Sequence, residues 1–323
     1  MIPDGLLDVL IIGAAGVIGS ALTRRFLDMG MTVKCMDVCR FNEAWRLAEV
    51  EDCKSKYVWK ASNDLVHDDV RGVDIIVDCG LGVADRPMGN SSPSYTVMTN
   101  ISPSLRILET IKHMDPKQIS VIYPSSFNTL YGYPAGSKYT SQMLPNPSSV
   151  YGWTKAAVES LYMTYQKAHG ISCVVTRVGS GYGFRMRSDE FPAQLMLNML
   201  MGNDITVRSP EAKRLWTYGE DIVDFYGKLV ENLDQYMGQT IHCAGNVGDS
   251  IVTNMSLARM VAKISDSRVQ IRAGPYEPGE VVDGKPISFT IDNQSPLWSP
   301  KFTLEAGMQK TFGWFEKNLS RYC

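Results

Sequence analysis

The sequence of 323 residues predicts a doubly wound parallel α/β sheet with a smaller C-terminal lobe. Short, continuous apolar runs alternate with helical patterns as far as Val178, and beyond it proline and glycine interrupt this regularity. Strands that are buried on both faces read as continuous hydrophobic runs, and intervening helices of about 10–15 residues indicate parallel pairing. The chain is long enough for one large domain with an added lobe, or for two domains.

The predicted elements follow one another in strand–helix order. The apolar runs expected as strands are residues 8–12, 32–37, 73–80, 119–126, 172–178 and 239–245. The helical patterns between them cover residues 20–30, 102–114 and 154–170. We therefore expect residues 1–178 to form the sheet-bearing domain, with a return segment of about 218–248. The smaller lobe is expected to comprise residues 179–217 and 249–323.

Composition excludes several classes of protein. The 32 Lys and Arg residues nearly balance the 34 Asp and Glu residues and are dispersed, so no nucleic-acid partner is expected. No apolar run approaches the roughly 20 residues that cross a bilayer, and the N-terminus lacks the pattern of a secretion signal. We therefore expect a cytoplasmic protein without membrane contact.

The seven cysteines are scattered along the chain. They lie at positions 35, 39, 53, 79, 173, 243 and 323, and no two of them form a CxxC pair. This spacing argues against a disulfide framework and against a zinc site. We expect reduced, mostly buried thiols and no metal.

Three glycines follow the first predicted strand in the stretch VLIIGAAGVIGS. Gly13 would allow a tight turn out of the strand, Gly16 would let the backbone approach a pyrophosphate, and Gly19 would let the next helix pack closely on the sheet. The N-terminus of that helix would then point at the phosphates. The glycines alone would also suit an ordinary turn before a helix, so the following residues decide between the two interpretations.

Asp37 supports the dinucleotide interpretation. It ends the second strand eighteen residues after Gly19, where an acid can bind both hydroxyls of an adenosine ribose. A carboxylate there favours NAD over NADP, and Arg40 could soften this preference unless it is a solvated surface residue. Three residues after the presumed third strand could meet the adenine edge or cap a helix: Asn63, Asp64 and Leu65. The sequence therefore predicts a Rossmann-type domain that binds NAD.

A second motif, YGWTK, places Tyr151 and Lys155 four residues apart at the start of an amphipathic helix. Residues at this spacing share a helix face, so the Lys155 ammonium can lie beside the Tyr151 phenol and favour its ionised form. Such pairs are common and often structural. This one gains weight from Ser125 and Ser126, because the predicted strand brings their hydroxyls to the carboxyl edge of the sheet, where ligands bind.

Together these motifs resemble the extended short-chain dehydrogenase/reductase family, in its nucleotide-sugar epimerase/dehydratase branch, over nearly the whole chain. The matching pieces are the three glycines, Asp37, SSFNTLYG at 125–132, YGWTK at 151–155 and TRVGSGYG at 176–183. Lesser matches are Asn100 within TNISPSLRILE, RLWTYGEDIVD at 214–224 and PGEV at 278–281.

The resemblance implies roles for individual residues. Tyr151 would act as general base and acid at a substrate hydroxyl, and Lys155 would tune it and hold the nicotinamide ribose. Ser126, with Ser125 as the alternate, would hydrogen-bond the same hydroxyl, and hydride would pass to NAD. The remaining implied cofactor contacts are Val17, Ile18, Gly80, Asn100 and Val178. The implied substrate contacts are Ser126, Ser180 and Arg214.

One departure from the family pattern bears on the reaction. Relatives that dehydrate carry an acidic pair just after the catalytic Ser or Thr, whereas Phe127, Asn128 and Thr129 follow Ser126 here. The spacing from Ser126 to Tyr131 is also one residue longer than in the family pattern. The sequence therefore lacks the acid expected of a dehydratase.

Other departures bear on the substrate. Ser180 stands where relatives often have an asparagine near the substrate diphosphate, and DCGLGVAD at 78–85 replaces the usual strand end. Glu277 stands where many relatives have an arginine, and a diphosphate would be repelled by it unless Arg214 or Arg272 compensates. The expected phosphate contacts are therefore unusual.

The leading hypothesis is an NAD-dependent epimerase of a nucleotide-sugar, most simply at C4, through a transient keto sugar. The alternative is an NAD-dependent dehydrogenase of a small hydroxy compound. The strand end PSS at 124–126 resembles that of the threonine-dehydrogenase-like members of the family. Glu277 and Ser180 favour the dehydrogenase, and Arg214 favours the epimerase. A non-catalytic NAD-binding regulator is disfavoured by the intact Tyr151 and Lys155 pair.

The sequence also suggests how the chain assembles. Helices such as 101–114 and 155–169 resemble those that pair in dimers of relatives. We expect a homodimer whose ligands are NAD and a small-molecule substrate.

Overall fold

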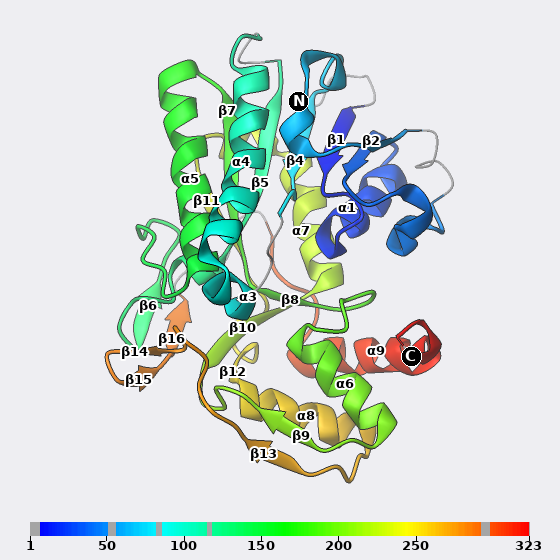
Figure 1. Ribbon diagram of the computed structural model, residues 1–323, viewed down its shortest axis with the longest axis vertical. Coiled ribbons are helices and arrows are strands. Elements are labelled where there is room, and N and C mark those ends of the chain that lie inside the picture. Colours follow the sequence, from blue (N-terminus) through cyan, green and yellow to red (C-terminus); the bar gives the residue numbers. More distant parts are fainter. Residues whose placement is uncertain (1–6, 51–55, 82–85, 115–117, 292–297, 323) are drawn as a thin grey trace.

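The computed structural model describes residues 7–50, 56–81, 86–114, 118–291 and 298–322. Its central sheet has seven parallel strands in the order β11–β7–β5–β4–β1–β2–β3, of which the run from β5 through β4 and β1 to β2 can be followed in Figure 1. The strands are β1 (Asp8–Ile12), β2 (Thr32–Asp37), β3 (Tyr57–Trp59), β4 (Ile75–Asp78), β5 (Ser120–Ser126), β7 (Ser172–Val178) and β11 (Thr240–Cys243). The strand order reverses between β1 and β4, where ligands bind in open sheets of this kind. The predicted doubly wound parallel sheet is confirmed.

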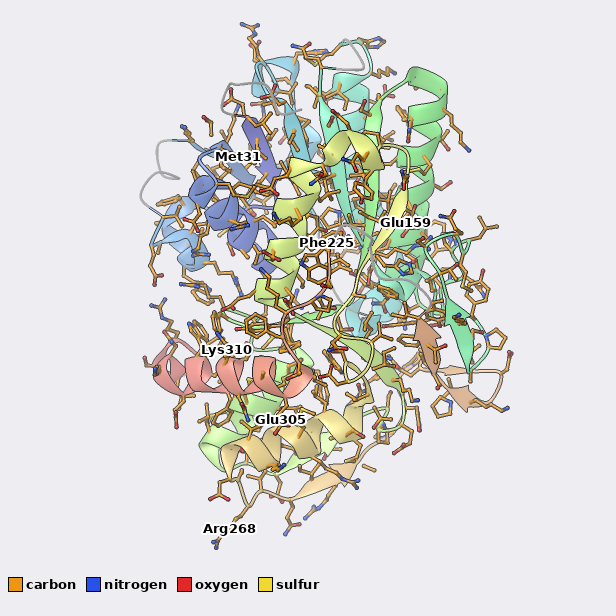
Figure 2. All side chains as sticks on the ribbon, turned by 180° about the vertical axis from the view of Figure 1, so that it is seen from behind. Met31, Glu159, Phe225, Arg268, Glu305 and Lys310 are labelled. Carbon is orange, nitrogen blue, oxygen red and sulfur yellow. The ribbon has the colours of Figure 1, made fainter. Side chains whose placement is uncertain are left out.

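Helices cover both faces of this sheet. One face carries α1 (Val17–Asp28) and α7 (Gly219–Glu231), and the other carries α4 (Pro93–Ile111) and α5 (Val150–His169). Figure 2 marks these faces by Phe225 of α7 and Glu159 of α5. Alternate residues of β1 contribute to the two cores, Val9 and Ile11 to one and Leu10 to the other. Both faces are therefore apolar, which explains the continuous hydrophobic run.

The helix that carries the tyrosine–lysine motif has clear end signals. Ser149 precedes α5, and its hydroxyl accepts a hydrogen bond from the Gly152 N–H at 3.1 Å, which caps the helix N-terminus. Gly170 ends the helix in the left-handed conformation, with a φ of 72°. These signals fix where Tyr151 and Lys155 lie relative to the sheet.

The neighbouring helix is longer than the sequence pattern predicts. α4 begins at Pro93 rather than near residue 102, and Pro103 lies inside it. A proline suits the first turn because the N–H that it lacks has no helical acceptor there. The pattern at 102–114 therefore marks only the second half of the helix.

The C-terminal part of the chain lies below the sheet in Figure 1. Its strands are β8 (Ser180–Tyr182), β9 (Ile205–Val207), β10 (Lys213–Tyr218), β12 (Ile251–Thr253), β13 (Ile271–Ala273), β14 (Val281–Val282), β15 (Lys285–Pro286) and β16 (Phe289–Ile291). Its helices are α6 (Phe191–Met201), α8 (Asn254–Ser265) and α9 (Leu304–Lys317). They share a separate apolar core that includes Trp216, Leu257 and Phe315. The division of the chain into a sheet-bearing domain and a smaller lobe stays a prediction.

A further strand pair joins the two parts. β6 (Ser137–Tyr139) precedes α5 in the chain and pairs in parallel with β16. Near it, α3 (Arg86–Ser91) lies against the start of α5. The short 3-10 helices of the described chain are residues 41–43, 45–47, 62–64, 67–69, 127–129, 233–236 and 319–321.

Three expectations from the sequence concern membrane-spanning helices, metal ligands and cysteines. Among the described residues, no helix combines the length and apolarity that a bilayer crossing requires. No cluster of metal-ligating side chains occurs in the same part of the chain. Five cysteines in it carry free thiols: Cys35, Cys39, Cys79, Cys173 and Cys243. Cys53 and Cys323 lie outside the described residues.

Candidate functional site

A cavity of about 1400 Å³ runs from the glycine loop at the end of β1 to the C-terminal part of the chain. This volume exceeds that of a pocket for one drug-sized ligand, so two ligands can share it. The predicted site residues that line it are Gly13, Gly16, Val17, Ile18, Gly19, Ser125, Ser126, Tyr151, Lys155, Val178, Ser180 and Arg214. The predicted residues outside its lining are Asp37, Asn63, Asp64, Leu65, Gly80 and Asn100.

The glycine loop is too tight for side chains at two of its three glycines. Gly13 has a φ of 77°, and a Cβ atom there would lie 2.5 Å from the carbonyl oxygen of Cys79. A Cβ atom on Gly19 would lie 2.2 Å from the carbonyl oxygen of Gly13. The roles predicted for these two residues, a tight turn and close helix packing, match this crowding.

Gly16 differs from the other two glycines. A Cβ atom on it would contact only the Gly13 carbonyl oxygen, at 3.2 Å, and its open side faces the cavity. Gly16 is also the N-cap of α1, which has no side-chain cap and no acidic residue in its first turn. The helix N-terminus therefore offers N–H groups and partial positive charge to an anion, which fits the pyrophosphate of a dinucleotide.

Asp37 holds the glycine loop in place. Its Oδ2 accepts a hydrogen bond from the Ala15 N–H at 2.8 Å, and its Oδ1 accepts one from the Cys39 N–H at 2.9 Å. A carboxylate oxygen has two lone pairs, so each oxygen keeps one for a ribose hydroxyl. The sequence did not indicate this second, structural role.

Arg40 lies on the outer surface at the same end of the sheet. Its guanidinium stacks 4.5 Å above the ring of Trp59, whose indole N–H donates to the Val38 carbonyl at 2.8 Å. Trp59 lies opposite Asp37 in the β2–β3 register. The stacking keeps the Arg40 guanidinium on the protein surface. Of the two roles that the sequence allowed, this matches the surface residue rather than the residue that softens the preference for NAD.

The 63–65 segment is bound to α4. Asn63 accepts a hydrogen bond from the Ser102 hydroxyl at 3.0 Å, and Asp64 is exposed. The Leu65 side chain is fully buried in the core, and its carbonyl accepts from the Arg106 Nε at 2.8 Å. These contacts hold the segment against α4, and none of its three residues lines the cavity.

Gly80 and Asn100 also lie behind the cavity wall. The Gly80 N–H donates to Asp78 Oδ1 at 3.3 Å and lies opposite Gly13. Asn100 of α4 is buried and donates to the Thr154 hydroxyl of α5 at 3.1 Å. Thr154 in turn donates to the carbonyl of Tyr151. Asn100 therefore supports the first turn of α5.

The Lys155 ammonium is buried with unused hydrogen-bonding capacity. The residue is 6% exposed, and its hydrogen bond within the described residues is to the Pro124 carbonyl, at 2.8 Å. An ammonium has three N–H donors, so two face other groups or a ligand. Burial lowers the pKa of Lys155 to about 8, although Asp78, Cys79 and Glu159 act to raise it.

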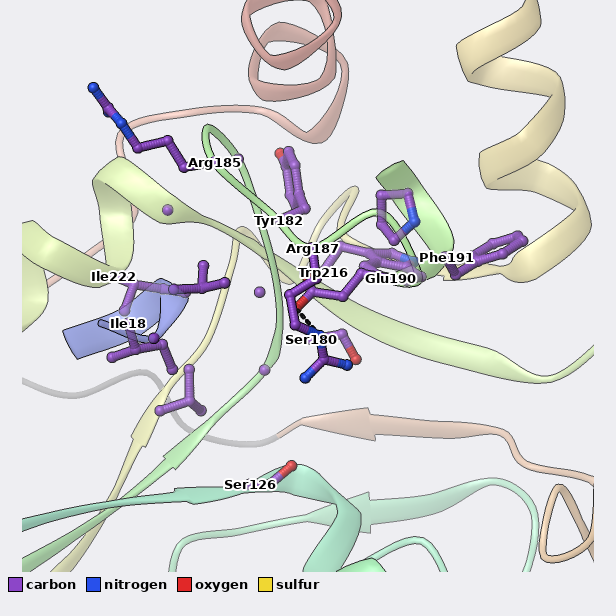
Figure 3. Close-up of a pocket in the computed structure, with 18 of the residues that line it drawn as sticks. Ile18, Ser126, Ser180, Tyr182, Arg185, Arg187, Glu190, Phe191, Trp216 and Ile222 are labelled. Carbon is purple, nitrogen blue, oxygen red and sulfur yellow. Dashed lines mark ion pairs between the residues drawn. The ribbon is translucent and has the colours of Figure 1, made fainter. Parts of the chain in front are cut away.

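Ser126 ends β5 and presents its hydroxyl to the cavity, as Figure 3 shows. Its Oγ accepts hydrogen bonds from the Asn128 N–H at 3.2 Å and from the Asn128 Nδ2 at 3.0 Å. Both lone pairs are then occupied, so the hydroxyl proton is left to donate. Ser126 is therefore set up as a hydrogen-bond donor toward the cavity.

Ser125 is already engaged inside the protein. Its hydroxyl donates to Glu159 Oε1 at 2.6 Å, and the Glu159 carboxylate is held by the guanidinium of Arg177, with a closest distance of 2.9 Å. Arg177 and Glu159 are both buried. Ser125 also lines the cavity, but its hydroxyl donates to Glu159, whereas the Ser126 hydroxyl proton is left to donate. This arrangement favours Ser126 over Ser125.

The arginine predicted for substrate phosphate lies in a buried ion pair. Arg214 contacts Glu280, donates to the Lys213 carbonyl at 2.7 Å and lies over the Tyr131 ring. Burial is the largest single effect on the pKa of Arg214 and lowers it, but Glu280, Tyr131 and Tyr139 together raise the pKa above its usual value. Arg214 therefore keeps its charge and shares it with a carboxylate.

Glu277 is neutralised by a residue that the sequence did not suggest. Its partner is Arg208, whereas Arg272 lies 3.6 Å from Asp204 and Arg214 is bound to Glu280. Arg208 and Glu277 both line the cavity. The two arginines proposed from the sequence as compensating charges do not form this pair.

Two polar groups in the cavity wall were not predicted. Asn128 orients Ser126, and its own Oδ1 has no hydrogen-bond partner in the described part of the chain. The indole N–H of Trp216 is buried, also without a partner there, and Figure 3 places this residue near Ser180 and Phe191. Because pairing depends on the folded structure, no sequence signal marks either atom as open.

The start of α5 is tied to the C-terminal part of the chain. The Val150 N–H donates to Asn90 Oδ1 at 3.0 Å, and Asn90 Nδ2 donates to the Pro278 carbonyl at 3.1 Å. The Ser148 hydroxyl donates to the Gly279 carbonyl at 2.7 Å. Glu280, the partner of Arg214, is the next residue after Gly279. The segment 278–280 therefore contacts both the start of α5 and Arg214.

Known proteins resemble the chain in sequence and in fold. UDP-glucuronic acid 4-epimerase from Bacillus cereus superposes with a TM-score of 0.85 at 22% identity, over 97% of this chain and all of that one. DesIV, a dTDP-glucose 4,6-dehydratase from Streptomyces venezuelae, superposes with a TM-score of 0.86 at 19% identity, over 98% of both chains.

A curated relative is longer than this chain. The trifunctional UDP-glucose 4,6-dehydratase/UDP-4-keto-6-deoxy-D-glucose 3,5-epimerase/UDP-4-keto-L-rhamnose-reductase of Arabidopsis thaliana is 25% identical over 96% of this chain. The chain spans about half of that protein, 47% of its length.

The sequence profile of the NAD dependent epimerase/dehydratase family matches residues 9–244, which include the glycine loop, Ser126, Tyr151 and Lys155. This match confirms the resemblance that the motifs predict. The chain belongs to the NAD-dependent epimerase/dehydratase family, and NAD is its cofactor.

Proposed function

We propose that the protein is an NAD-dependent epimerase of a nucleotide-sugar that acts at C4 through a transient keto sugar. The observation that carries this proposal is the cavity itself. Tyr151, Lys155, Ser126 and the open glycine loop all line it, and the three residues after Ser126 carry no carboxyl group. The fold similarity to UDP-glucuronic acid 4-epimerase, which was crystallised with UDP-glucuronic acid and NAD, supports it.

The cofactor would lie along the glycine-loop end of the cavity. Gly16 and the N-terminus of α1 would hold the pyrophosphate, Asp37 the adenosine ribose and Lys155 the nicotinamide ribose. The remaining proposed cofactor contacts are Gly13, Val17, Ile18, Gly19, Asn63, Asp64, Leu65, Gly80, Asn100, Tyr151 and Val178. When bound, NAD would supply the hydride acceptor for oxidation of the sugar carbon and the hydride donor for its reduction from the other face.

The proton of the reacting hydroxyl is handled by the chain's own residues. Ser126 donates its hydroxyl proton to the substrate oxygen, because both of its lone pairs are taken by Asn128. The substrate O–H is then directed at Tyr151, whose phenolate takes the proton and later returns it. The ammonium of Lys155 stabilises that phenolate.

The residues after Ser126 disfavour dehydration. Elimination of water needs an acid at the leaving hydroxyl, and the positions that follow Ser126 offer none. Phe127 is buried in the core, Asn128 binds Ser126, and Thr129 is buried and donates to the Ser126 carbonyl at 2.9 Å. An epimerase needs no such acid, because the oxygen stays on the sugar.

A second candidate is an NAD-dependent dehydrogenase of a small hydroxy compound. The ion pairs Arg214–Glu280 and Arg208–Glu277 favour the dehydrogenase. In each pair a carboxylate neutralises an arginine that could otherwise bind a diphosphate. The size of the cavity favours the nucleotide-sugar.

A turnover assay distinguishes the two candidates. An epimerase regenerates its NAD in every cycle, so the protein should interconvert UDP-glucuronic acid or UDP-glucose with the 4-epimer without lasting absorbance from NADH. The products are resolved by NMR of the anomeric protons. Sustained NADH formation with a small hydroxy compound, and no epimer, would establish the dehydrogenase instead.

We also propose that the protein is a homodimer paired through α4 and α5. Large apolar side chains are exposed on these helices: Tyr95, Met98 and Leu105 on α4, and Trp153 on α5. Soluble monomers rarely leave several such residues on one surface. Light scattering should give twice the chain mass, and Met98→Glu together with Leu105→Glu should shift it to a monomer.

A further inference from the structure

Asp78 is a buried carboxylate that the proposed reaction does not use. It is the last residue of β4 and is 1% exposed. Its carboxylate accepts hydrogen bonds from the Ser104 hydroxyl at 2.6 Å, from the Tyr162 hydroxyl at 2.8 Å and from the Gly80 N–H at 3.3 Å. Three donors on one carboxylate stabilise its ionised form.

This carboxylate has no arginine or lysine within 4.0 Å in the described part of the chain. A buried charge without a partner is costly, so a nearby cation is expected to balance it. A short series of contacts leads from Asp78 to Lys155. Tyr162 binds Asp78, the Tyr162 and Tyr123 rings are 5.2 Å apart, and the Lys155 ammonium lies 4.6 Å from the Tyr123 ring centroid.

We propose that Asp78 is a positioning residue for the reaction, and that its carboxylate keeps the buried Lys155 ammonium protonated. Asp78 does not line the cavity in which the two proposed ligands would lie. It acts through Lys155, which carries the charge that the reaction needs. The inference rests on the proposed function only for the consequence in activity.

The other groups around Lys155 cannot supply this charge. Asp78, Cys79 and Glu159 act on its pKa in that order of importance, against the larger effect of burial. The pKa of the Cys79 thiol is raised to about 12, so it is neutral near pH 7. Glu159 is already paired with Arg177. Of these three side chains, Asp78 is therefore the one that carries a negative charge not paired with another cation.

The groups that face Asp78 are consistent with this assignment. Burial is the largest effect on the pKa of Asp78 and raises it on balance, although Ser104 and Tyr162 act to lower it by hydrogen bonding and Lys155 by its charge. Burial also raises the pKa values of Tyr123 and Tyr162 well above their usual value, so both phenols stay neutral. Lys155 is the cation that balances Asp78, and each charge stabilises the other.

The experiment compares Asp78→Asn with Asp74→Asn. Both substitutions delete one negative charge from the same part of the chain, but Asp74 binds the Asp8 N–H at the opposite end of β4. The Lys155 ammonium is titrated by NMR in purified protein with lysine labelled with carbon-13 at Cε, and Lys155→Met identifies its signal. The alkaline limb of kcat/KM is measured in parallel.

Asp78→Asn should lower the Lys155 midpoint from about 8 by at least about one pH unit, and Asp74→Asn should leave it in place. Activity that needs the charged ammonium is lost as pH rises through this midpoint, so the alkaline limb should move down by the same amount. A purely structural role would instead lower kcat equally at all pH values.

Two outcomes separate this inference from the proposed function. An unchanged Lys155 midpoint in Asp78→Asn overturns the inference. A lowered midpoint with an unchanged alkaline limb upholds it and contradicts the proposed role of Lys155 in turnover. If Asp78→Asn does not fold, Asp78→Ser deletes the same charge with a smaller side chain, and the same lowering of the Lys155 midpoint is expected.

Discussion

At the glycine-loop end of the cavity, polar groups are left open to a ligand, whereas at the C-terminal end the charged groups are already paired with one another. The α1 N-terminus has no side-chain cap, and Lys155 uses one of its three donors within the described residues. In contrast, Arg187, Arg208 and Arg214 each contact a carboxylate. The glycine-loop end therefore has free hydrogen-bond donors for a ligand. At the C-terminal end, a ligand must first replace the internal ion pairs before it can contact the arginines.

The largest effect that would test this contrast is expected at Gly16. Gly16→Val should abolish measurable NAD binding, because its side chain would fill the space where the backbone meets the pyrophosphate. The fold should persist, since a Cβ atom there meets only one protein atom. Calorimetric titration with NAD measures the loss.

Gly19→Ala is the matched control. Its Cβ atom would lie 2.2 Å from the Gly13 carbonyl oxygen, so it should lower thermal stability where Gly16→Val does not. Normal NAD binding by Gly16→Val would show that the phosphates lie elsewhere.

Tyr151→Phe should reduce turnover by at least about 10²–10⁴-fold, because it removes the phenol that accepts the substrate proton. Substrate and NAD binding should survive, since the ring and its packing remain. Tyr165→Phe on the same helix removes a hydroxyl that binds Glu109 and should leave turnover near the parental rate. Near-parental turnover in Tyr151→Phe would make this residue structural.

At the C-terminal end, Glu280→Gln should lower the free energy of unfolding by about 3–5 kcal/mol, because it leaves the buried Arg214 charge without its partner. UDP should restore more stability to this variant than to the parent if Arg214 binds phosphate. Thermal unfolding with and without UDP measures both effects. Equal stabilisation of the two proteins would remove Arg214 from the substrate site and favour the dehydrogenase.

The smallest effects should separate the two serines. Ser126→Ala should lower kcat by about tenfold with little change in stability, because one hydrogen bond to the reacting oxygen is lost. Ser125→Ala should lower stability by about 1 kcal/mol, because the buried Glu159 loses a donor, and should leave kcat nearly unchanged. The reverse pattern would assign the catalytic hydroxyl to Ser125.

The same contrast explains what could be predicted from the sequence. The glycine-loop end depends on local patterns: a continuous apolar strand, glycines with limited space and an acid at the end of β2. Tyr151 and Lys155 share a helix face by their spacing alone. The sheet and this end of the site could therefore be predicted from neighbours in the chain.

The C-terminal end depends on pairs that are distant in sequence. Arg214 and Glu280 are separated by 66 residues, and Arg208 and Glu277 by 69. No local sequence pattern relates such distant positions. The sequence therefore suggests a phosphate contact for Arg214 but does not reveal that Glu280 pairs with it. The choice between Ser125 and Ser126 likewise required the position of Glu159.

The hydrogen bonds from Asn90 to Val150 and to Pro278 have a consequence for motion. Asn90, which accepts from the Val150 N–H, is itself held by the Pro278 carbonyl, so we expect local opening of that segment to loosen the Val150 hydrogen bond. Exchange of this amide with solvent deuterium then reports the opening of the far end of the cavity. A ligand that closes the C-terminal end slows that exchange and steadies the turn that bears Tyr151.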